Sequence, residues 1–136
     1  MIDKEIIKIA SNTENHGMLS NHTHSSKLKN TICGDEMKVY LIVKNNKIQD
    51  FKYECESCIY CQASVSLLSI KAKKKSIEII KKFIEQAKNS FVENVKSFDK
   101  EWKEFDKIMT KNNISRKECL LLPLNTTLDA LDKKSL

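Results

Sequence analysis

The chain has 136 residues, of which 40% are hydrophobic and 31% are charged, and its formal net charge at pH 7 is +6. This length fits one domain, residues 1–136, and the composition is ordinary for a soluble globular protein. Acidic residues, Asp3 and Glu5, stand among the first isoleucines, and no long apolar run follows. We therefore expect neither a signal peptide nor a membrane-spanning helix, and we predict a cytoplasmic protein without a membrane partner.

The positive charge comes from lysines that concentrate in the middle of the chain: Lys71, Lys73, Lys74, Lys75, Lys81, Lys82 and Lys88. Aromatic residues, on which nucleic-acid bases stack, are not interleaved between Lys71 and Lys82. A solvated helix face is the favoured interpretation, and we expect no nucleic-acid partner.

The first predicted element is a short amphipathic helix behind Asp3, with Ile2, Ile6 and Ile9 at helical spacing. It could pack on the core or meet a partner. Residues 11–30 are rich in Asn, Ser, Thr and His and predict a loop, with one short edge strand near residues 27–32. The loop contains His16, His22 and His24. Of these, His22 and His24 are weak candidates for metal ligands, because exposed histidines in polar loops usually bind none.

A β-hairpin is predicted next. Val39, Leu41 and Val43 alternate with mostly polar neighbours, Asn45-Asn46 supplies residues that tolerate left-handed dihedral angles, and residues 48–53 return as a second strand. Ahead of the hairpin stands Cys33-Gly34-Asp35, in which the Cys and Asp side chains project from the same side of the backbone and Gly34 permits a tight turn.

Helices are predicted for the rest of the chain. Ser57 is a candidate N-cap for a helix from Cys58 to Lys73, and Ser76 for a second helix. The buried stripe predicted for that second helix comprises Ile77, Ile80, Ile84 and Ala87, widened by Ile79 and Phe83. A third helical stretch is predicted from its apolar spacing: Phe91, Val95, Phe98, Trp102, Phe105 and Met109. Pro123 is placed in the first turn of a last helix, with Cys119 just ahead of it.

Five cysteines, in a chain for which we expect a reducing compartment, favour metal binding or sulfur chemistry over disulfides. Three of them form C-x2-C-x2-C: Cys55, Cys58 and Cys61. Together with Cys33, Asp35 and Cys119, the candidate ligands outnumber the four positions of a tetrahedral zinc or iron site, so spacing alone does not choose among them. A structural zinc knot of the three close cysteines remains an alternative.

Three segments of the sequence resemble a known family. They are C-G-D-E-M-K-V-Y-L-I-V-K-N-N-K-I, C-I-Y-C-Q-A-S-V-S-L-L followed by K-A-K-K-K-S, and R-K-E-C-L-L-L-P-L-N-T-T-L-D-A-L. They are similar to the iron-sulfur cluster assembly family of IscU, the NifU N-terminal domain and SufU. The R-x-x-C-x-x-L-P pattern with Arg116, and the additional stretch around Phe91 to Met109, resemble the SufU branch more than IscU. Departures from the family pattern are Ser57, Cys61 and the extra Cys55.

The resemblance implies an α+β fold, with a small antiparallel β-sheet that has helices packed on one face. It also implies that Cys33, Asp35, Cys58 and Cys119 converge as the site for zinc, iron or a transient Fe-S cluster. The implied function is an assembly scaffold or sulfur acceptor that is supplied by a cysteine desulfurase and serves downstream Fe-S acceptor or scaffold proteins.

Two alternatives stay open beside this slightly favoured, non-catalytic scaffold: a zinc-dependent sulfurtransferase of SufU type, and a zinc-stabilised binding protein without sulfur chemistry. Two cysteines qualify as the first sulfur acceptor. Cys33 lies on a Gly-containing turn, whereas Cys119 lies beside Arg116, whose charge lowers a thiol pKa. A SufU-like protein would use Cys33 with Arg116 assisting, and an IscU-like one would use Cys119. We favour Cys33.

Overall fold

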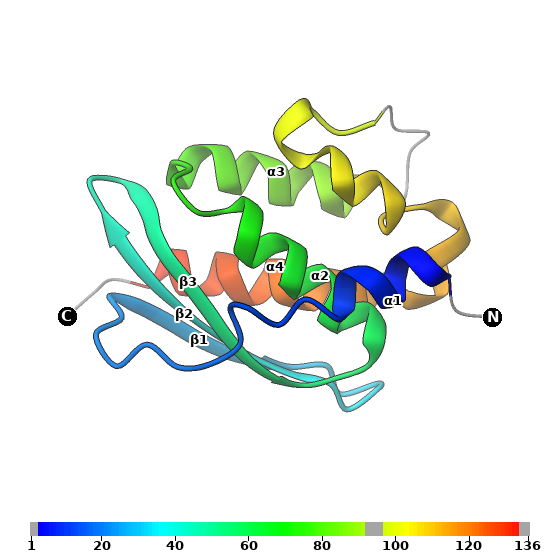
Figure 1. Cartoon of the computed structure of the whole chain (residues 1–136), viewed down its shortest axis with the longest axis horizontal. Coiled ribbons are helices and arrows are strands. Elements are labelled where there is room, and N and C mark those ends of the chain that lie inside the picture. Colours follow the sequence, from blue (N-terminus) through cyan, green and yellow to red (C-terminus); the bar gives the residue numbers. More distant parts are fainter. Residues whose placement is uncertain (1–2, 92–96, 134–136) are drawn as a thin grey trace.

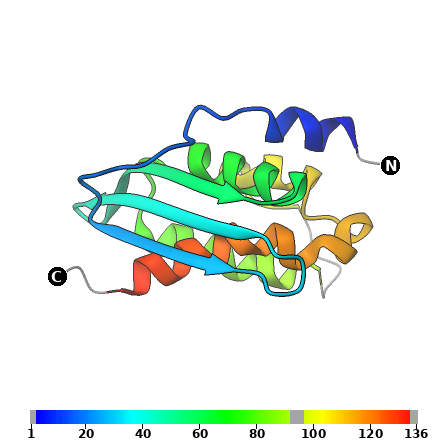
Figure 2. The same ribbon diagram turned by 90° about the horizontal axis from the view of Figure 1, so that it is seen from below.

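A computed structural model describes residues 3–91 and 97–133. The elements in chain order are α1 (Lys4–Ala10), β1 (His24–Lys29), β2 (Glu36–Lys44), β3 (Lys47–Glu56), α2 (Ile59–Lys71), α3 (Ile77–Asn89), the 3₁₀ helices η1 (Lys100–Lys107) and η2 (Lys111–Arg116), and α4 (Lys117–Asp132). The strands form an antiparallel sheet in the order β1-β2-β3, and the helices gather on one side of it (Figures 1 and 2). The predicted α+β fold is confirmed.

The central hairpin follows the sequence prediction. Strands β2 and β3 pair from Glu36 opposite Glu56 to Lys44 opposite Lys47, with one irregularity of register between Ile42 and Val43. The two turn residues, Asn45 and Asn46, have φ angles of 53° and 62°. Asparagine tolerates this left-handed region better than most residues, which is why the pair closes a two-residue hairpin.

Strand β1 lies on the free side of β2, three residues earlier in the chain than predicted. The polar segment before it covers part of the opposite sheet edge instead. The Tyr53 N–H donates to the Asn15 carbonyl at 3.2 Å, and the Gly17 N–H donates to the Tyr53 carbonyl at 2.8 Å. Buried Asn15 also donates from its side chain to the Ser69 hydroxyl at 3.0 Å, so this segment is fixed to β3 and α2.

The core lies between the sheet and α2, α3 and α4. The inner face of the sheet contributes fully buried apolar residues: Met37, Val39, Leu41, Ile48 and Phe51. Helix α2 contacts α1, α4, β3 and η1, and its buried Ser64 hydroxyl donates to the Leu120 carbonyl of α4 at 2.7 Å. Because α2 has neighbours on most sides, it is the element through which the layers hold together.

Two serines were predicted as helix N-caps, one of them correctly. The Ser76 hydroxyl accepts from the Ile79 N–H at 3.3 Å and caps α3 as expected. Helix α2, in contrast, begins at Ile59, and its N-cap is Cys58 rather than Ser57. The stripe predicted for α3 is also too wide. Phe83 is buried, but Ile79 is 45% exposed, because it lies on the outer side of the helix.

The aromatic stretch forms a 3₁₀ helix rather than the long helix predicted for residues 91–109. The predicted Val95 lies outside the described residues, while Phe98, Trp102, Phe105 and Met109 are buried as expected. A 3₁₀ helix aligns residues three apart, which explains why Ile108 joins Trp102 and Phe105 on the buried side. Their anchor is Phe83 of α3, whose ring stacks on Trp102 with centroids 4.0 Å apart and an interplanar angle of 9°.

The last helix starts six residues earlier than predicted. Pro123 lies inside α4, and Cys119 falls in the first turn instead of ahead of the helix. Proline has no N–H, so it cannot donate to the carbonyl four residues earlier, which is that of Cys119. Near the other end of α4, Asp129 accepts a hydrogen bond from the Ser26 hydroxyl of β1. None of the described helices is long and apolar enough to cross a membrane.

The aromatic anchor can be tested by truncation. Replacing Phe83 with alanine removes the ring that contacts Trp102, Phe98 and Phe105, so we expect a loss of about 3–5 kcal/mol in the free energy of unfolding, measured with urea. Ile79→Ala, on the exposed side of the same helix, is the control and should change it by about 0.5 kcal/mol or less. Equal losses in both variants would contradict this packing.

Candidate metal and sulfur site

A tight loop between β1 and β2 presents Cys33. The Asn30 N–H donates to the Asp35 carbonyl at 2.8 Å, and the Gly34 N–H donates to the Asn30 carbonyl at 2.7 Å. The Asn30 side chain also accepts the Ile32 N–H at 3.0 Å, so one residue closes the loop three times. Gly34 has a φ angle of +78°, in a region that favours glycine. The Cys33 side chain is therefore held at an exposed turn.

The carboxylate of Asp35 is buried, with only 6% of the residue exposed. One oxygen, Oδ1, accepts the Cys58 N–H at the start of α2 at 3.1 Å. This contact is favourable because the positive end of the helix dipole lies there. The other oxygen, Oδ2, is buried and has no hydrogen-bond partner among the described residues. A buried carboxylate oxygen without a donor is costly, and a cation would satisfy it.

Helix α4 brings Cys119 to the same place. The Cys33 and Cys119 sulfurs are 3.6 Å apart, and these sulfurs and a carboxylate oxygen of Asp35 all lie within 4.8 Å of one another. Burial raises the pKa of the Cys119 thiol, and hydrogen bonds with the Cys58 and Cys33 thiols raise it further. The Cys58 thiol thus borders this three-residue group, so the structure gathers all four predicted ligands at one end of the molecule.

Arg116 does not act on Cys119 as the sequence suggested. Its guanidinium carbon lies 5.2 Å from the centroid of the Tyr60 ring, a cation–π distance, and Arg116 is also the N-cap residue of α4. The pKa of the Cys119 thiol is raised rather than lowered, because burial dominates and the neighbouring thiols act in the same direction. The predicted lowering of this pKa by Arg116 is therefore wrong.

The remaining two cysteines differ in position. Cys61 is fully buried in α2, and burial raises the pKa of its thiol, which favours a neutral core residue. Cys55 is half-buried on the inner side of β3, opposite Met37. Within residues 3–91 and 97–133, the one group of three clustered ligands contains neither of them. This geometry disfavours a zinc knot of Cys55, Cys58 and Cys61.

The histidines lie elsewhere. A ring nitrogen of His22 is 2.6 Å from the Leu19 carbonyl, and one of His24 is 2.8 Å from the Thr23 hydroxyl. Both residues thus have local partners and remain weak candidates for ligands, as expected. The structure adds an organising residue that sequence reasoning missed, Asn30, because an asparagine in a polar loop gave no signal of its own.

Comparisons with known proteins agree with this geometry. Residues 1–108 match the family model described as the NifU-like N terminal domain. The chain belongs to this family. It is 31% identical over 135 residues to the iron-sulfur cluster assembly scaffold protein IscU of Thermotoga maritima, covering 99% of this chain and 95% of that protein. The family is one of scaffolds for iron-sulfur cluster assembly.

Solved structures show the same fold. A putative iron-sulfur cluster assembly scaffold protein for the SUF system from Fervidobacterium islandicum superposes with a TM-score of 0.87 at 25% identity, covering 96% of each chain. The N-terminal part of a nitrogen-fixing NifU-like protein from Brucella abortus gives a TM-score of 0.88 at 20% identity, covering 95% of this chain and 90% of that one.

Metal binding by the four-residue set can be measured directly. We expect Cys33→Ala, Cys58→Ala and Cys119→Ala each to lower the bound zinc or iron per chain after anaerobic purification, and chelation to lower the melting temperature of the wild type, because binding stabilises the folded chain. Cys61→Ala, which removes a buried thiol outside the group, is the matched control and should keep its metal. Unchanged metal content in the three site variants would contradict the assignment.

Proposed function

We propose that this chain is an iron-sulfur cluster assembly scaffold that receives sulfur from a cysteine desulfurase and holds iron, zinc or a nascent cluster through Cys33, Asp35, Cys58 and Cys119. The observation that supports this most is the pair of sulfurs 3.6 Å apart beside a carboxylate oxygen that has no hydrogen-bond partner among the described residues. Membership of the scaffold family supports it independently.

The ligand chemistry suits a site that must release what it holds. Thiolates are soft ligands for zinc and iron, whereas the harder carboxylate of Asp35 binds such metals less tightly. Because ligand thiols must lose their protons, and because burial favours the neutral thiol of Cys119, the protein without metal holds protons that binding would expel. One weaker ligand and one proton-holding thiol both make exchange easier.

Exposure separates the possible sulfur acceptors. Cys33 is exposed, on a turn with a glycine, while Cys119 is only 5% exposed and Cys58 is held at a helix start. A persulfide presented by a desulfurase must be reached by the attacking sulfur. The Cys33 thiolate would attack the outer sulfur, the donor's S–S bond would break, and the donor cysteine would leave as a thiolate. We therefore place the first persulfide on Cys33.

The acceptor can be identified by peptide mass. After incubation with a desulfurase and cysteine, without reductant, we expect one added sulfur on the Cys33 peptide. Cys33→Ser should abolish labelling, and Cys61→Ser should not alter it. Persulfide on Cys119 alone would overturn the assignment to Cys33, and persulfide on neither would overturn sulfur acceptance.

A zinc-dependent sulfurtransferase is the second candidate. The similarity to the SUF-system protein, which extends over 96% of each chain, and the R-x-x-C pattern around Arg116 favour it. The same experiment separates the two functions once iron is added. A scaffold forms a cluster on the chain, whereas a transferase keeps its zinc, passes its sulfur to an acceptor and forms none.

The desulfurase contact is better sought on the loops than on α1. Ile6 is fully buried and Ile9 packs against the core, so the apolar face of α1 is already covered. Ile32, in contrast, is 88% exposed next to Cys33, and Ile114 is 54% exposed in η2. The β1–β2 loop and η2 lie at the same end of the molecule (Figure 2). We therefore place the contact around Ile32.

Several lysines of the lysine-rich segment already have acidic partners within the chain, which argues against this segment as the desulfurase contact. Lys71 pairs with Glu104 at 2.6 Å, Lys73 with Asp50 at 3.5 Å and Lys81 with Asp132 at 2.9 Å. These lysines form ion pairs within the chain, and the side chains of Lys71 and Lys73 are only partly exposed.

Replacing Ile32 with aspartate should weaken binding of the desulfurase about tenfold, or ~1.4 kcal/mol, measured by titration calorimetry, because a charge replaces an exposed apolar side chain at the rim of the site. Ile79→Asp makes the same substitution at an exposed isoleucine on α3, and this variant should bind as the wild type does. A loss of binding on charge reversal at Lys73, Lys74 and Lys75, with none in Ile32→Asp, would overturn the placement.

A further inference from the structure

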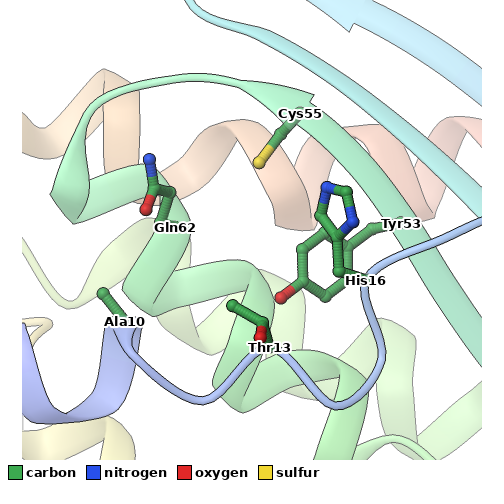
Figure 3. A pocket seen from close by; sticks show the side chains of 6 residues that line it. All are labelled: Ala10, Thr13, His16, Tyr53, Cys55 and Gln62. Atoms are coloured by element: carbon green, nitrogen blue, oxygen red, sulfur yellow. The ribbon is translucent and has the colours of Figure 1, made fainter.

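A second cavity contains a cysteine that the four-residue site does not use. It has a volume of about 470 Å³ and lies between the N-terminal segment, which contributes Ala10, Thr13 and His16, and the layer behind it, which contributes Tyr53, Cys55 and Gln62. In Figure 3 the Cys55 thiol points into this space, with the His16 imidazole on one side of it and Gln62 on the other. The volume is within the range of pockets that bind small molecules.

Backbone and side-chain contacts hold the N-terminal segment, which forms one wall of the cavity, against β3 and α2. The backbone of Asn15 and Gly17 pairs with Tyr53 on both sides of His16, and the Ser66 hydroxyl of α2 donates to the Asn12 carbonyl at 2.6 Å. The His16 ring meets the edge of Tyr53 with centroids 5.5 Å apart and an interplanar angle of 87°. The imidazole is thus held beside β3 by its own backbone and by a ring contact.

The chemistry of the lining is that of a thiol with a proton acceptor. His16 and Cys55 also line a second hollow, together with charged residues of the outer sheet face, so both residues border both spaces. Burial raises the pKa of the Cys55 thiol, so a base must take its proton before it can attack. Burial also raises the pKa of Tyr53 to about 12, so its phenol keeps its proton at neutral pH.

A metal ion is a poor occupant for this cavity. A closed zinc site needs four ligands, and within the described residues no cluster of three ligand atoms includes Cys55 or His16. A sulfur electrophile suits a single thiol better. Burial, and to a smaller extent the charge of Asp35, raises the pKa of the Cys55 thiol, and Cys55 precedes Cys58 of the four-residue site by three positions.

We infer that Cys55 is a second acceptor of sulfane sulfur, and that the cavity binds the persulfide that donates it, either a small persulfide such as cysteine persulfide or the persulfide of a protein. This deepens the proposed function, on which it rests, by adding a route for sulfur that bypasses Cys33. His16 takes the proton of the Cys55 thiol, and the thiolate attacks the outer sulfur of R–S–SH. The donor's S–S bond breaks, RS⁻ leaves and is protonated, and Cys55–S–SH remains, so no oxidant or reductant is consumed.

The test uses the full chain, loaded with zinc, in two arms: one with cysteine persulfide alone and one with a desulfurase and cysteine. Cys55, Cys58 and Cys61 share the peptide bounded by Lys52 and Lys71, so fragmentation of that peptide must assign the added sulfur. We expect the mass of one sulfur atom on Cys55 in at least one arm, and the arm in which it appears identifies the donor. Cys55→Ser should lose this mass and keep its zinc.

The role of His16 is tested by rate. At neutral pH, His16→Gln should load Cys55 at least tenfold more slowly than the wild type, and the difference should shrink at alkaline pH, where the thiolate forms unaided. His24→Gln, a histidine of β1 with a local partner, is the control. The titratable groups that face His16 are Tyr53 and Cys55 in the cavity and, in the second hollow, Lys27, Glu36, Lys38, Glu54 and Glu56.

The outcomes separate this inference from the proposed function. Sulfur on Cys33 or Cys119 with none on Cys55 in either arm would overturn the second acceptor and leave the scaffold proposal standing. Sulfur on Cys55 from cysteine persulfide, with no labelling by the desulfurase anywhere, would support the cavity and overturn sulfur acceptance from a desulfurase. Equal rates in wild type and His16→Gln at neutral pH would overturn the role of the imidazole.

Discussion

One hydrogen bond ties the reactive loop to the core: the Cys58 N–H donates to Asp35 Oδ1 at 3.1 Å. The two residues are 23 positions apart and flank the β2–β3 hairpin. The hairpin brings them back together, and the hydrogen bond joins its two ends. Because Cys58 begins α2, and α2 contacts α1, α4, β3 and η1, the position of Asp35 is set by the whole helical layer. The loop that carries Cys33 can move only within that limit.

The same carboxylate gives the physical reason to propose a cation at this site. Asp35 is 6% exposed, and one of its oxygens has no hydrogen-bond partner among the described residues. Burial of a charge without sufficient partners is costly, and the helix dipole of α2 compensates only one oxygen. The Cys119 thiol lies in the same place with a raised pKa, since neighbouring thiols and burial favour its neutral form. A cation would lower the free energy of both groups, and it would do so by displacing a proton from sulfur.

The sequence predicted correctly those turns, strands and caps that depend on residues close together in the chain. The Asn45-Asn46 turn, the alternation of Val39 and Leu41, and the Ser76 cap all appear in the structure, because each depends on residues close together in the chain. The convergence of Cys33 with Cys119, 86 positions apart, could not be derived from spacing and came from the family resemblance.

The errors share a cause: tertiary contacts override a local preference. Ser57 is a good N-cap by type, but Asp35 supplies the acceptor at the start of α2, so the helix begins one residue later. Pro123 is tolerated inside α4 because the helix is packed on α2, β1 and β2. The apolar steps of the aromatic stretch alternate between four and three residues, which favours an α-helix, but the three-residue steps from Trp102 to Phe105 and Ile108 also suit the observed 3₁₀ helix, which packs on Phe83.

Tertiary contacts also determine the surroundings of Cys55, the cysteine that is extra to the family pattern. The polar segment around Asn15 was read as a loop, yet its backbone pairs with Tyr53 and thereby builds a wall opposite Cys55. Burial and, to a smaller extent, the charge of Asp35 raise the pKa of the Cys55 thiol, and Asp35 also belongs to the group that contains the exposed Cys33. If Cys55 accepts sulfur as inferred, one carboxylate is therefore common to the surroundings of both acceptors.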